Sequence, residues 1–472
     1  MSGVRLLTTE RTAPDAATME RLESISRQPW VREMVALGDV HWKPRMETPS
    51  STATATGGEI VMGLSSSAQN CGMMAVRTPL HAGAEGDMSL VVRLMHALRE
   101  EIPRSRTVPI ITREESLRFV AGGAAAAAEH FGLSPDLVAG VEGGGSLFDG
   151  EGVERSELLS IIDEKSLERG RSSFAFIGGG NHFLEIQAVE EILEPEACRE
   201  LGIHAGQIMI MFHTGSERLG SDLGRLFAVR LKTSANKKRK YFFRKIPLHL
   251  IRGMPGPVSV TRRVRYYFSR RPYIPVPVDS AEGRRMLLSL KAGGNYGYAN
   301  RIAVLALIQR ALGRISGAAG DGLGVVADLS HNVIAKERIA GEDLWMHRHN
   351  AVRLRPPSDF PAGSLYRRIG QPSPLPGTNR TSSYLILSRE GATATLNSAD
   401  HGAGQTVELF EKRGLSRERQ DRRTLKFGYR SANPTVVSHL GDEGVDEVIG
   451  ILRESNVAVP AARLRPLAVL KG

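Results

Sequence analysis

Short apolar segments with strand character alternate with helical segments along this chain of 472 residues, without a regular strand–helix–strand rhythm. The segment 206–216 is strand-like and ends in a polar turn, and 322–337 contains a strand followed by a turn with a histidine. Helical spacing is present in 119–133 and 299–312. Because a doubly wound parallel sheet requires the missing rhythm, the pattern predicts an α+β fold with mixed β-sheets flanked by helices.

Two further segments carry patterns of small residues and turns. The segment 48–58 consists of small residues and is predicted to be a loop or an edge strand. The segment 382–402 is predicted to form a hairpin, with strands on either side of the turn 389–391 and the second strand ending at His401. No repeat of fixed period is visible, so the length permits two or three domains or one large domain with insertions.

Cysteine content and hydropathy indicate the compartment. Two cysteines, Cys71 and Cys198, are too few for a disulfide framework and suggest a reducing environment. The N-terminal segment lacks the apolar stretch of a signal peptide, and no run of about 18 apolar residues is present. We therefore expect a cytoplasmic protein without a membrane span. A monomer is the expected form, although the sequence leaves the oligomeric state open.

The net charge of +11 is concentrated in one basic block, residues 223–278. This block contains 15 Lys/Arg and no Asp or Glu, so the rest of the chain carries 47 basic residues against 51 acidic ones. Aromatic residues interleave with the cations in 236–245 and 261–273, which suits a polyanion with stackable bases. The block is predicted to contact nucleic acid. The alternative is a solvated insertion that only aids solubility.

One histidine lies in a stretch of very small side chains, residues 397–405 (NSADHGAGQ). His401 is followed by Gly-Ala-Gly, which lets a bulky ligand approach the main chain and leaves N–H groups free for anions. Taken alone, the stretch is more simply explained as a tight turn with a surface histidine.

Four further side chains form a candidate metal-ligand set: Cys71, His182, His213 and His331. A lone histidine at the end of a strand is more often a structural residue. One thiolate and three imidazoles together, however, suit Zn, Mn, Fe or Co. Ligands scattered singly along the chain imply a site assembled by the fold, where a metal with free positions could hold and polarise a phosphate.

A third candidate segment, 370–386, contains a turn at Pro376-Gly377 followed by several hydroxyl side chains. Hydroxyl and backbone donors of this kind suit a phosphate or a nucleobase. The alternative is a polar turn that precedes a strand. Near the end of the chain, the apolar run LAVL could anchor Lys471.

Taken together, the motifs resemble those of the RtcB-type RNA ligases, a family that includes tRNA-splicing ligases. The resemblance extends from Asp39 to the end of the chain, and the motifs occur in the family's order. They are DVH (39–41), NCG (70–72), GGGNHFLEI (178–186), HTGS (213–216), NYGYANR (295–301), HNVIAKE (331–337), HR (347–348), GQPSPLPG (370–377), SSYL (382–385), HGAG (401–404) and the terminal KG. The resemblance implies one catalytic domain over 1–472, built around a central metal and nucleotide pocket, with the basic block as an insertion.

The function implied by the resemblance is RNA repair or tRNA splicing, in which an RNA 3′-phosphate or 2′,3′-cyclic phosphate end is joined to a 5′-hydroxyl end. GTP and one or two Mn²⁺ ions would be required, and His401 would carry GMP covalently. The metal ligands would be Cys71, His182, His213 and His331. The nucleotide contacts would be Asn181, Glu185, Pro376, Gly377, Thr378, Ser383, His401, Gly402, Ala403, Gly404 and Lys471.

Several positions depart from the family pattern. Ala68 stands where the family has an aspartate that binds metal, and Glu217 stands where it has an arginine. Gln405 and His349 replace a further arginine and a lysine. Because alanine cannot coordinate a metal, the activity is expected to be reduced. The alternative function is that of a degenerate relative that binds nucleotide or RNA, with or without self-guanylylation, and does not ligate.

The basic block yields a test that depends on charge alone. Reversing Lys237, Lys238 and Arg239 to glutamate should weaken RNA binding and flatten its salt dependence, by about one unit of slope for each RNA phosphate that is no longer neutralised. RNA affinity measured over a range of salt concentrations checks this. An unchanged affinity and slope would assign the block to solubility.

Overall fold

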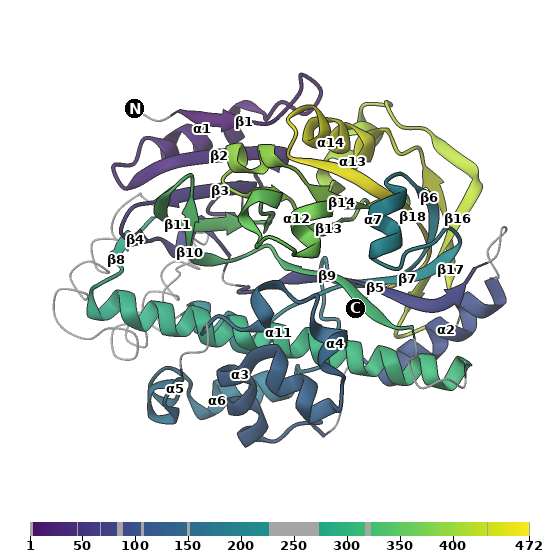
Figure 1. The fold of residues 1–472 in the computed structure, drawn as a ribbon, viewed down its shortest axis with the longest axis horizontal. Coiled ribbons are helices and arrows are strands. Elements are labelled where there is room, and N and C mark those ends of the chain that lie inside the picture. The colour runs from purple at the N-terminus through teal and green to yellow at the C-terminus, as the bar shows by residue number, and fades with distance from the viewer. Residues whose placement is uncertain are drawn as a thin grey trace, which may run out of the picture.

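The computed structural model describes residues 3–44, 46–66, 68–82, 88–104, 108–148, 152–225, 273–316, 322–431 and 433–471. Most of the basic block, including Lys237, Lys238 and Arg239, lies outside these residues. The described chain combines mixed sheets with flanking helices, which confirms the predicted α+β fold class (Figure 1). The assignment of residues 1–472 to a single catalytic domain stays a prediction.

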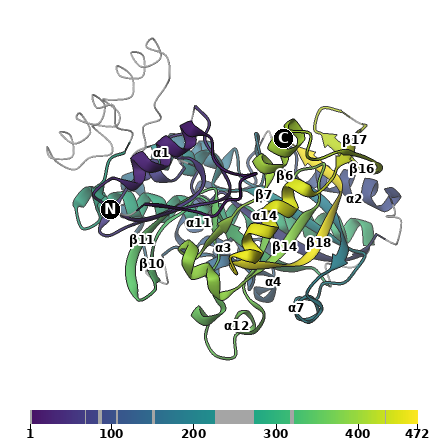
Figure 2. The ribbon, with the colours of Figure 1, turned by 90° about the horizontal axis from the view of Figure 1, so that it is seen from above.

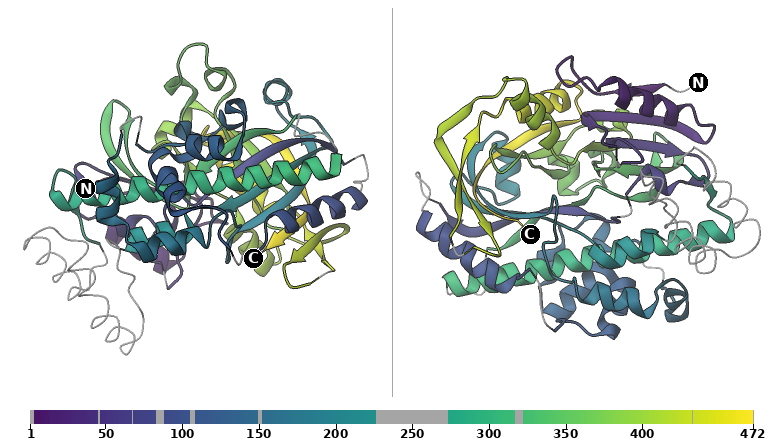
Figure 3. Two further views of the ribbon diagram at one scale, coloured as in Figure 1. Left: turned by 90° about the horizontal axis from the view of Figure 1, so that it is seen from below. Right: turned by 180° about the vertical axis from the view of Figure 1, so that it is seen from behind.

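The largest sheet has nine strands and joins segments from distant parts of the chain. Its main path runs in the order β13, β14, β18, β6, β7, β5 and β9, and β16 pairs with β18 and with β17. The long last strand, β18, therefore places the end of the chain inside the sheet (Figure 3). The strands are β5 (Gly72–His81), β6 (Phe183–Ile192), β7 (Gln207–Thr214), β9 (Gly324–Ser330), β13 (Pro372–Leu375), β14 (Ser383–Ser388), β16 (Glu418–Gly428), β17 (Thr435–Leu440) and β18 (Ala458–Lys471).

A second sheet of five strands, in the order β1-β2-β3-β11-β10, combines the N-terminal part of the chain with a later hairpin. Two short ribbons, β12–β15 and β4–β8, complete the β-structure of the described residues. These strands are β1 (Val4–Leu6), β2 (Val31–His41), β3 (Ser50–Thr56), β4 (Glu59–Ile60), β8 (Val276–Pro277), β10 (Ile334–Ile339), β11 (Glu342–His349), β12 (Ala351–Arg353) and β15 (Ser398–Asp400).

The prediction for segment 48–58 is wrong, because this segment contains an interior strand. Strand β3 pairs with β2 on one side and with β11 on the other, and all seven of its residues are buried. Its alternating threonine and alanine side chains are small enough to be buried on both faces of the sheet.

The predicted hairpin over 382–402 is also wrong. Strand β14 pairs with β13 and β18, and the residues after it form a 3₁₀ turn, Glu390–Thr395. Leu396 and Asn397 then adopt positive φ angles of 57° and 50°, and the chain passes to another ribbon, where β15 pairs with β12. The alternation of side chains indicated strands, but it did not specify their partners.

The helix predicted at 299–312 is the central part of α11 (Ala281–Ser316), which has 36 residues. Figure 1 shows the sheets on one side of α11 and α3, α5 and α6 on the other, and Figure 2 shows α14 in the region of β14 and β18. No helix within the described ranges is long and apolar enough to cross a membrane. The other helices are α1 (Ala16–Ser26), α2 (Met88–Glu101), α3 (Arg113–Phe131), α4 (Pro135–Val138), α5 (Arg155–Ile161), α6 (Glu164–Arg171), α7 (Pro195–Glu200), α8 (Glu217–Arg225), α12 (Leu365–Ile369), α13 (Gly404–Lys412) and α14 (Glu443–Glu454), with 3₁₀ turns at Met62–Leu64, Glu142–Gly145 and Pro357–Asp359.

A fully buried arginine joins α11 to the nine-stranded sheet. Arg301 Nε lies 2.5 Å from Oδ1 of Asp328 on β9, and its Nη1 donates to the carbonyl of Asn70 at 2.8 Å. Asp328 is also buried, so each charge depends on the other for stabilisation. The pair therefore connects the helix, the sheet and the loop that contains Asn70.

Replacing Arg301 with methionine should leave the Asp328 carboxylate buried without its cation. The free energy of unfolding should fall by about 3–5 kcal/mol, measured by urea denaturation. The control is Arg314→Met on the same helix. Arg314 is half-exposed and pairs with Glu100 at the surface, so its loss should lower the free energy of unfolding far less than the loss of Arg301. Equal losses in the two variants would contradict the assigned role of Arg301.

Candidate functional site

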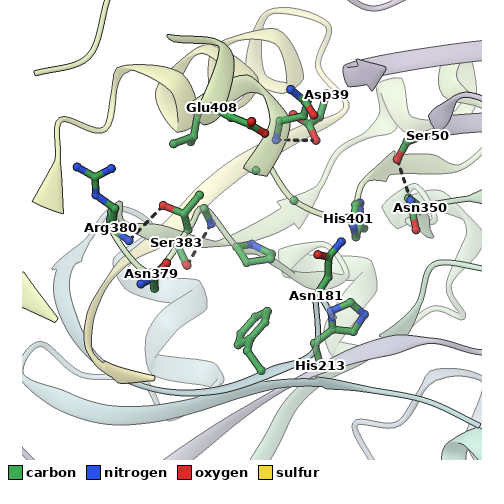
Figure 4. A pocket seen from close by; sticks show the side chains of 18 of the residues that line it. Asp39, Ser50, Asn181, His213, Asn350, Asn379, Arg380, Ser383, His401 and Glu408 are labelled. Atoms are coloured by element: carbon green, nitrogen blue, oxygen red, sulfur yellow. Dashed lines mark hydrogen bonds between the residues drawn. The ribbon is translucent and has the colours of Figure 1, made fainter. Parts of the chain in front are cut away.

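A cavity of about 470 Å³ lies at the junction of β6, β7, β18, the turn after β13 and the start of α13. In Figure 4, His401, His213 and Asn181 lie on one side, and Arg380, Asn379 and Ser383 lie on the opposite side. The predicted nucleotide contacts that line the cavity are Asn181, Glu185, Pro376, Gly377, Thr378, Ser383, His401, Gly402, Gly404 and Lys471. Ala403 is fully buried and packs in an apolar cluster instead.

The four predicted metal ligands lie together, and His213 also lines the cavity. Cys71 Sγ is 3.1 Å from His182 Nε2 and 3.0 Å from His213 Nε2. His213 Nε2 is in turn 3.1 Å from His331 Nε2. The ligand atoms of Cys71, His182 and His213 all lie within 4.8 Å of one another, as ligands of a common cation must, and His331 adjoins this group through His213.

Sheet topology explains why these residues meet. Cys71 immediately precedes β5, His213 lies near the end of β7, and His331 follows β9. Because β5 is antiparallel to both of its neighbours, its start lies beside the ends of β7 and β9. His182 precedes β6, which pairs with β7 in the same antiparallel manner.

The loop that carries Cys71 is held by close backbone contacts. Asn70 has a positive φ of 49°. A Cβ at Gly72 would lie 2.9 Å from the guanidinium carbon of Arg301, and a Cβ at Gly215 would lie 2.7 Å from Cys71 Cα. Any side chain at the glycine of the NCG motif or of the HTGS motif would collide with these neighbours, so both positions require glycine.

The imidazoles in the cluster have opposite shifts in pKa. Burial, assisted by neighbouring histidines, holds the pKa of His213 and His331 well below the ordinary value. Burial also disfavours the charged form of His182, but the Cys71 sulfur and the Glu217 carboxylate outweigh it and raise its pKa. Without a cation, these pKa shifts favour the protonated form at His182 and the neutral form at His213 and His331.

His401 follows β15 and lies next to this cluster, with its ring centroid 4.7 Å from that of His331. Burial, together with His41 and His349, lowers the pKa of His401 to about 4. A Cβ on Gly402 would approach the Pro376 carbonyl to 3.0 Å, whereas Gly404 has no heavy atom within 4 Å of that position. Gly402 therefore permits close packing against Pro376, and Gly404 leaves open space near the imidazole.

A buried aspartate supports the backbone on the other side of His401. Asp39 accepts from the Thr406 amide at 2.6 Å and from the Thr406 hydroxyl at 2.7 Å, within the first turn of α13. Asp400 in turn accepts from the amides of Gly38 and Asp39, each at 3.0 Å. Burial raises the pKa of Asp39 and of Asp400 to about 7 each. This network fixes the turn that contains His401.

Other residues that line the cavity were not in the predicted set. They include Asp39, His41, Lys43, Asn350, Asn379, Arg380, Gln405, Glu408 and Glu411. Asp39 and His41 belong to the DVH motif, and Asn379 and Arg380 follow directly after Pro376-Gly377-Thr378, so motif position was the available signal. Glu408 and Glu411 lie one helical turn apart on α13, and no sequence signal pointed to them.

Glu185 is the buried acid of the cavity wall. Its Oε1 accepts from Gln187 Nε2 at 2.7 Å, and burial raises its pKa to about 8. Because the folded-state pKa exceeds that of the unfolded chain, Glu185 favours folding at low pH. This contribution is lost as the pH rises from about 4.5 to about 8.

The Glu185→Gln variant should remove this pH dependence from the metal-free protein. The difference in free energy of unfolding between E185Q and the parent should be about 2–4 kcal/mol more favourable to E185Q at pH 8 than at pH 5. Urea denaturation at both pH values measures the difference. Glu191→Gln, a change at a half-exposed site on the same strand, is the control and should show no such gain. If the free energies of unfolding of the parent and of E185Q changed equally between pH 5 and pH 8, the raised pKa of Glu185 would be contradicted.

Comparison with known proteins places this site in a family. A family model described as tRNA-splicing ligase RtcB matches residues 21–472. The chain is 31% identical over 327 residues to a tRNA-splicing ligase RtcB of Pyrococcus horikoshii, covering 66% of this chain and 34% of the relative. With the Pyrococcus furiosus protein of the same name, identity is 29% over 424 residues, or 85% of this chain and 40% of the relative.

The relative from Archaeoglobus fulgidus, also named tRNA-splicing ligase RtcB, is 26% identical over 420 residues, which are 85% of this chain and 80% of the relative. The chain thus spans between a third and two fifths of the length of the two Pyrococcus relatives. Since the family model matches nearly all of the sequence, this chain belongs to the RtcB family.

Proposed function

We propose that the chain is an RNA ligase that joins a 3′-phosphate or 2′,3′-cyclic phosphate end to a 5′-hydroxyl end, using GTP and Mn²⁺. The observation that carries the proposal is the position of His401, whose neutral ring borders both the Cys–His cluster and the cavity. Family membership supports RNA as the substrate class. The particular RNA ends and the nucleotide are the finer part of the proposal.

His401 is the proposed nucleophile. A bond forms between an imidazole nitrogen and the α-phosphorus of GTP while the bond to the pyrophosphate leaving group breaks. This attack requires a free electron pair on the ring, and the pKa of about 4 keeps His401 neutral near pH 7. Burial therefore favours the reactive form of the side chain.

Two transfer steps complete the proposed reaction. The N–P bond breaks as GMP passes to the RNA 3′-phosphate, and a cyclic phosphate must first be opened by water. The 5′-hydroxyl then attacks this activated phosphate, and GMP leaves as the phosphodiester forms. His401 is regenerated as a neutral imidazole.

Cys71, His182, His213 and His331 would hold the divalent cation. The fit is supported by the mutual approach of the Cys71 sulfur and the His182 and His213 Nε2 atoms, with His331 Nε2 beside that of His213, a donor set suited to a borderline cation. When bound, the cation would neutralise charge on the phosphate that His401 attacks. Removing one preorganised interaction of this kind costs about 3–4 kcal/mol of transition-state stabilisation.

The opposite wall offers groups for the nucleotide. The hydroxyl of Ser383 accepts from the Gly377 amide at 3.2 Å, which orders the turn beside the cavity. Glu185 and Lys471 lie on adjacent strands, paired through Val469 and its neighbours. A protonated Glu185 can donate a hydrogen bond to a base, and Lys471 supplies a cation to a polar edge or a phosphate.

A second candidate function rests on Ala68, where the methyl side chain has no donor atom. The Ala68 carbonyl accepts from the Cys71 amide at 3.4 Å, so the residue lies beside the cluster but adds nothing to it except backbone. A protein with this site could bind nucleotide or RNA, or accept GMP on His401, without completing ligation.

Incubation with GTP labelled at the α-phosphate and with Mn²⁺ separates these functions. We expect covalent label on the parent protein and none on His401→Ala, because no other side chain replaces the nucleophile. The exposed His204 provides the control, and His204→Ala should be labelled normally. Label retained by His401→Ala would refute the assignment. Label on the parent without joining of RNA ends would favour the second function.

A further inference from the structure

A carboxylate that the family pattern does not contain lies behind the metal-ligand cluster. Glu217 begins α8, directly after the His213-Thr-Gly-Ser motif. Its Oε1 is 3.0 Å from Nδ1 of His182, and the other ring nitrogen of His182, Nε2, is 3.1 Å from Cys71 Sγ. The carboxylate lies within hydrogen-bond distance of Nδ1, although the contact is not aligned as a hydrogen bond in this structure. The imidazole therefore lies between a thiol and a carboxylate.

Local backbone geometry is adapted to this contact. Glu217 has a positive φ of 46°, a conformation that a glutamate rarely adopts and that costs free energy. Gly178 has a φ of 76°, and a Cβ there would lie 2.5 Å from His182 Nδ1 and 2.6 Å from Glu217 Oε1. The first glycine of the GGGNHF motif therefore leaves the space in which the two side chains meet.

The surrounding groups hold the Glu217 carboxylate in place. The Thr214 hydroxyl lies 3.2 Å from Glu217 Oε1, and the side chains of Glu217 and His182 are 17% and 18% exposed. A partly buried carboxylate beside the outer nitrogen of a ligand imidazole fixes the orientation of the ring and strengthens the inner nitrogen as a donor.

Charge balance gives the contact a further role. A divalent cation among Cys71, His182, His213 and His331 would meet only one anionic ligand, the thiolate. Ala68 supplies no carboxylate. Glu217 supplies the second negative charge from the outer side, through His182.

We propose that Glu217 is a positioning residue that orients His182 and tightens the binding of a divalent cation, in place of the carboxylate that is missing at Ala68. This inference rests on the metal site of the proposed function. The glutamate that replaces the family's arginine at residue 217 would thus compensate, in metal binding, for the missing carboxylate.

Titration of the metal-free full chain with Mn²⁺, followed by calorimetry, tests the proposal. E217Q removes the charge and should raise the Kd for Mn²⁺ by about 10- to 100-fold. E115Q is the matched control, because Glu115 pairs with His130 Nδ1 at 3.3 Å on α3, and its Kd should stay within twofold of the parent value. A Kd for E217Q within twofold of the parent would overturn the proposal.

A double-mutant cycle tests whether Glu217 acts through His182. Removing the charge at residue 217 should have little further effect in an H182A background, because the ring that it orients is absent. Equal losses in both backgrounds would overturn the positioning role. Absorption spectra of the Co²⁺-loaded proteins provide a second readout, and the ligand-field bands of E217Q should shift while those of E115Q match the parent. Unshifted bands would also count against the proposal.

Folding is monitored with E217G, since glycine tolerates the positive φ. Metal-free E217G should unfold at no lower urea concentration than the parent and still bind Mn²⁺ more weakly, which excludes misfolding as the cause. E217G with parental affinity would overturn the proposal. A parent chain that binds neither Mn²⁺ nor Co²⁺ would overturn the metal site and the role of Glu217 together. If the parent binds metal and the residue 217 variants bind it equally well, only the role of Glu217 is overturned and the proposed ligase stands.

Discussion

The buried guanidinium of Arg301 is the contact on which the cysteine–histidine cluster depends. It pairs with Asp328 on β9 and donates to the Asn70 carbonyl, so helix α11, the nine-stranded sheet and the Cys71 loop share one charged group. Gly72 leaves no space for a side chain beside it. The thiol is therefore positioned by the core of the protein. A rigid position matters because the distances to His182 and His213 leave little slack for a common cation.

Much of the site could be predicted because its ligand types and motifs are visible in the sequence, and antiparallel pairing then brings the strand ends that carry them together. Cys71, His213 and His331 each lie at an end of an apolar run, and β7, β5 and β9 are neighbours with β5 reversed. The fold class and the helix around 299–312 could be predicted from periodicity, because local spacing of apolar residues determines the type of element. Strand partners did not follow, as β3 and the false hairpin over 382–402 show, because pairing depends on contacts between distant segments.

Carboxylates at the site were harder to predict than imidazoles. Asp39 belongs to a recognised motif, but its role as acceptor for the first turn of α13 depends on the packing of β2 against that helix. Glu217 was visible in the sequence only as the replacement of an arginine. Its contact with His182 requires a positive φ at Glu217 and the absence of a side chain at Gly178, neither of which a sequence pattern specifies.

The position of Glu217 also reconciles two opposing electrostatic requirements. A cation centre that binds a nucleotide needs negative charge to hold the metal, but negative charge beside the nucleotide repels its phosphates. Glu217 contacts the outer nitrogen of His182, and the contacts then continue through Cys71, His213 and His331 to His401. The carboxylate can therefore support the cation from behind, while the rings nearest the cavity, His213 and His401, have lowered pKa values and remain neutral. The negative charge at residue 217 therefore lies on the far side of His182 from the thiolate.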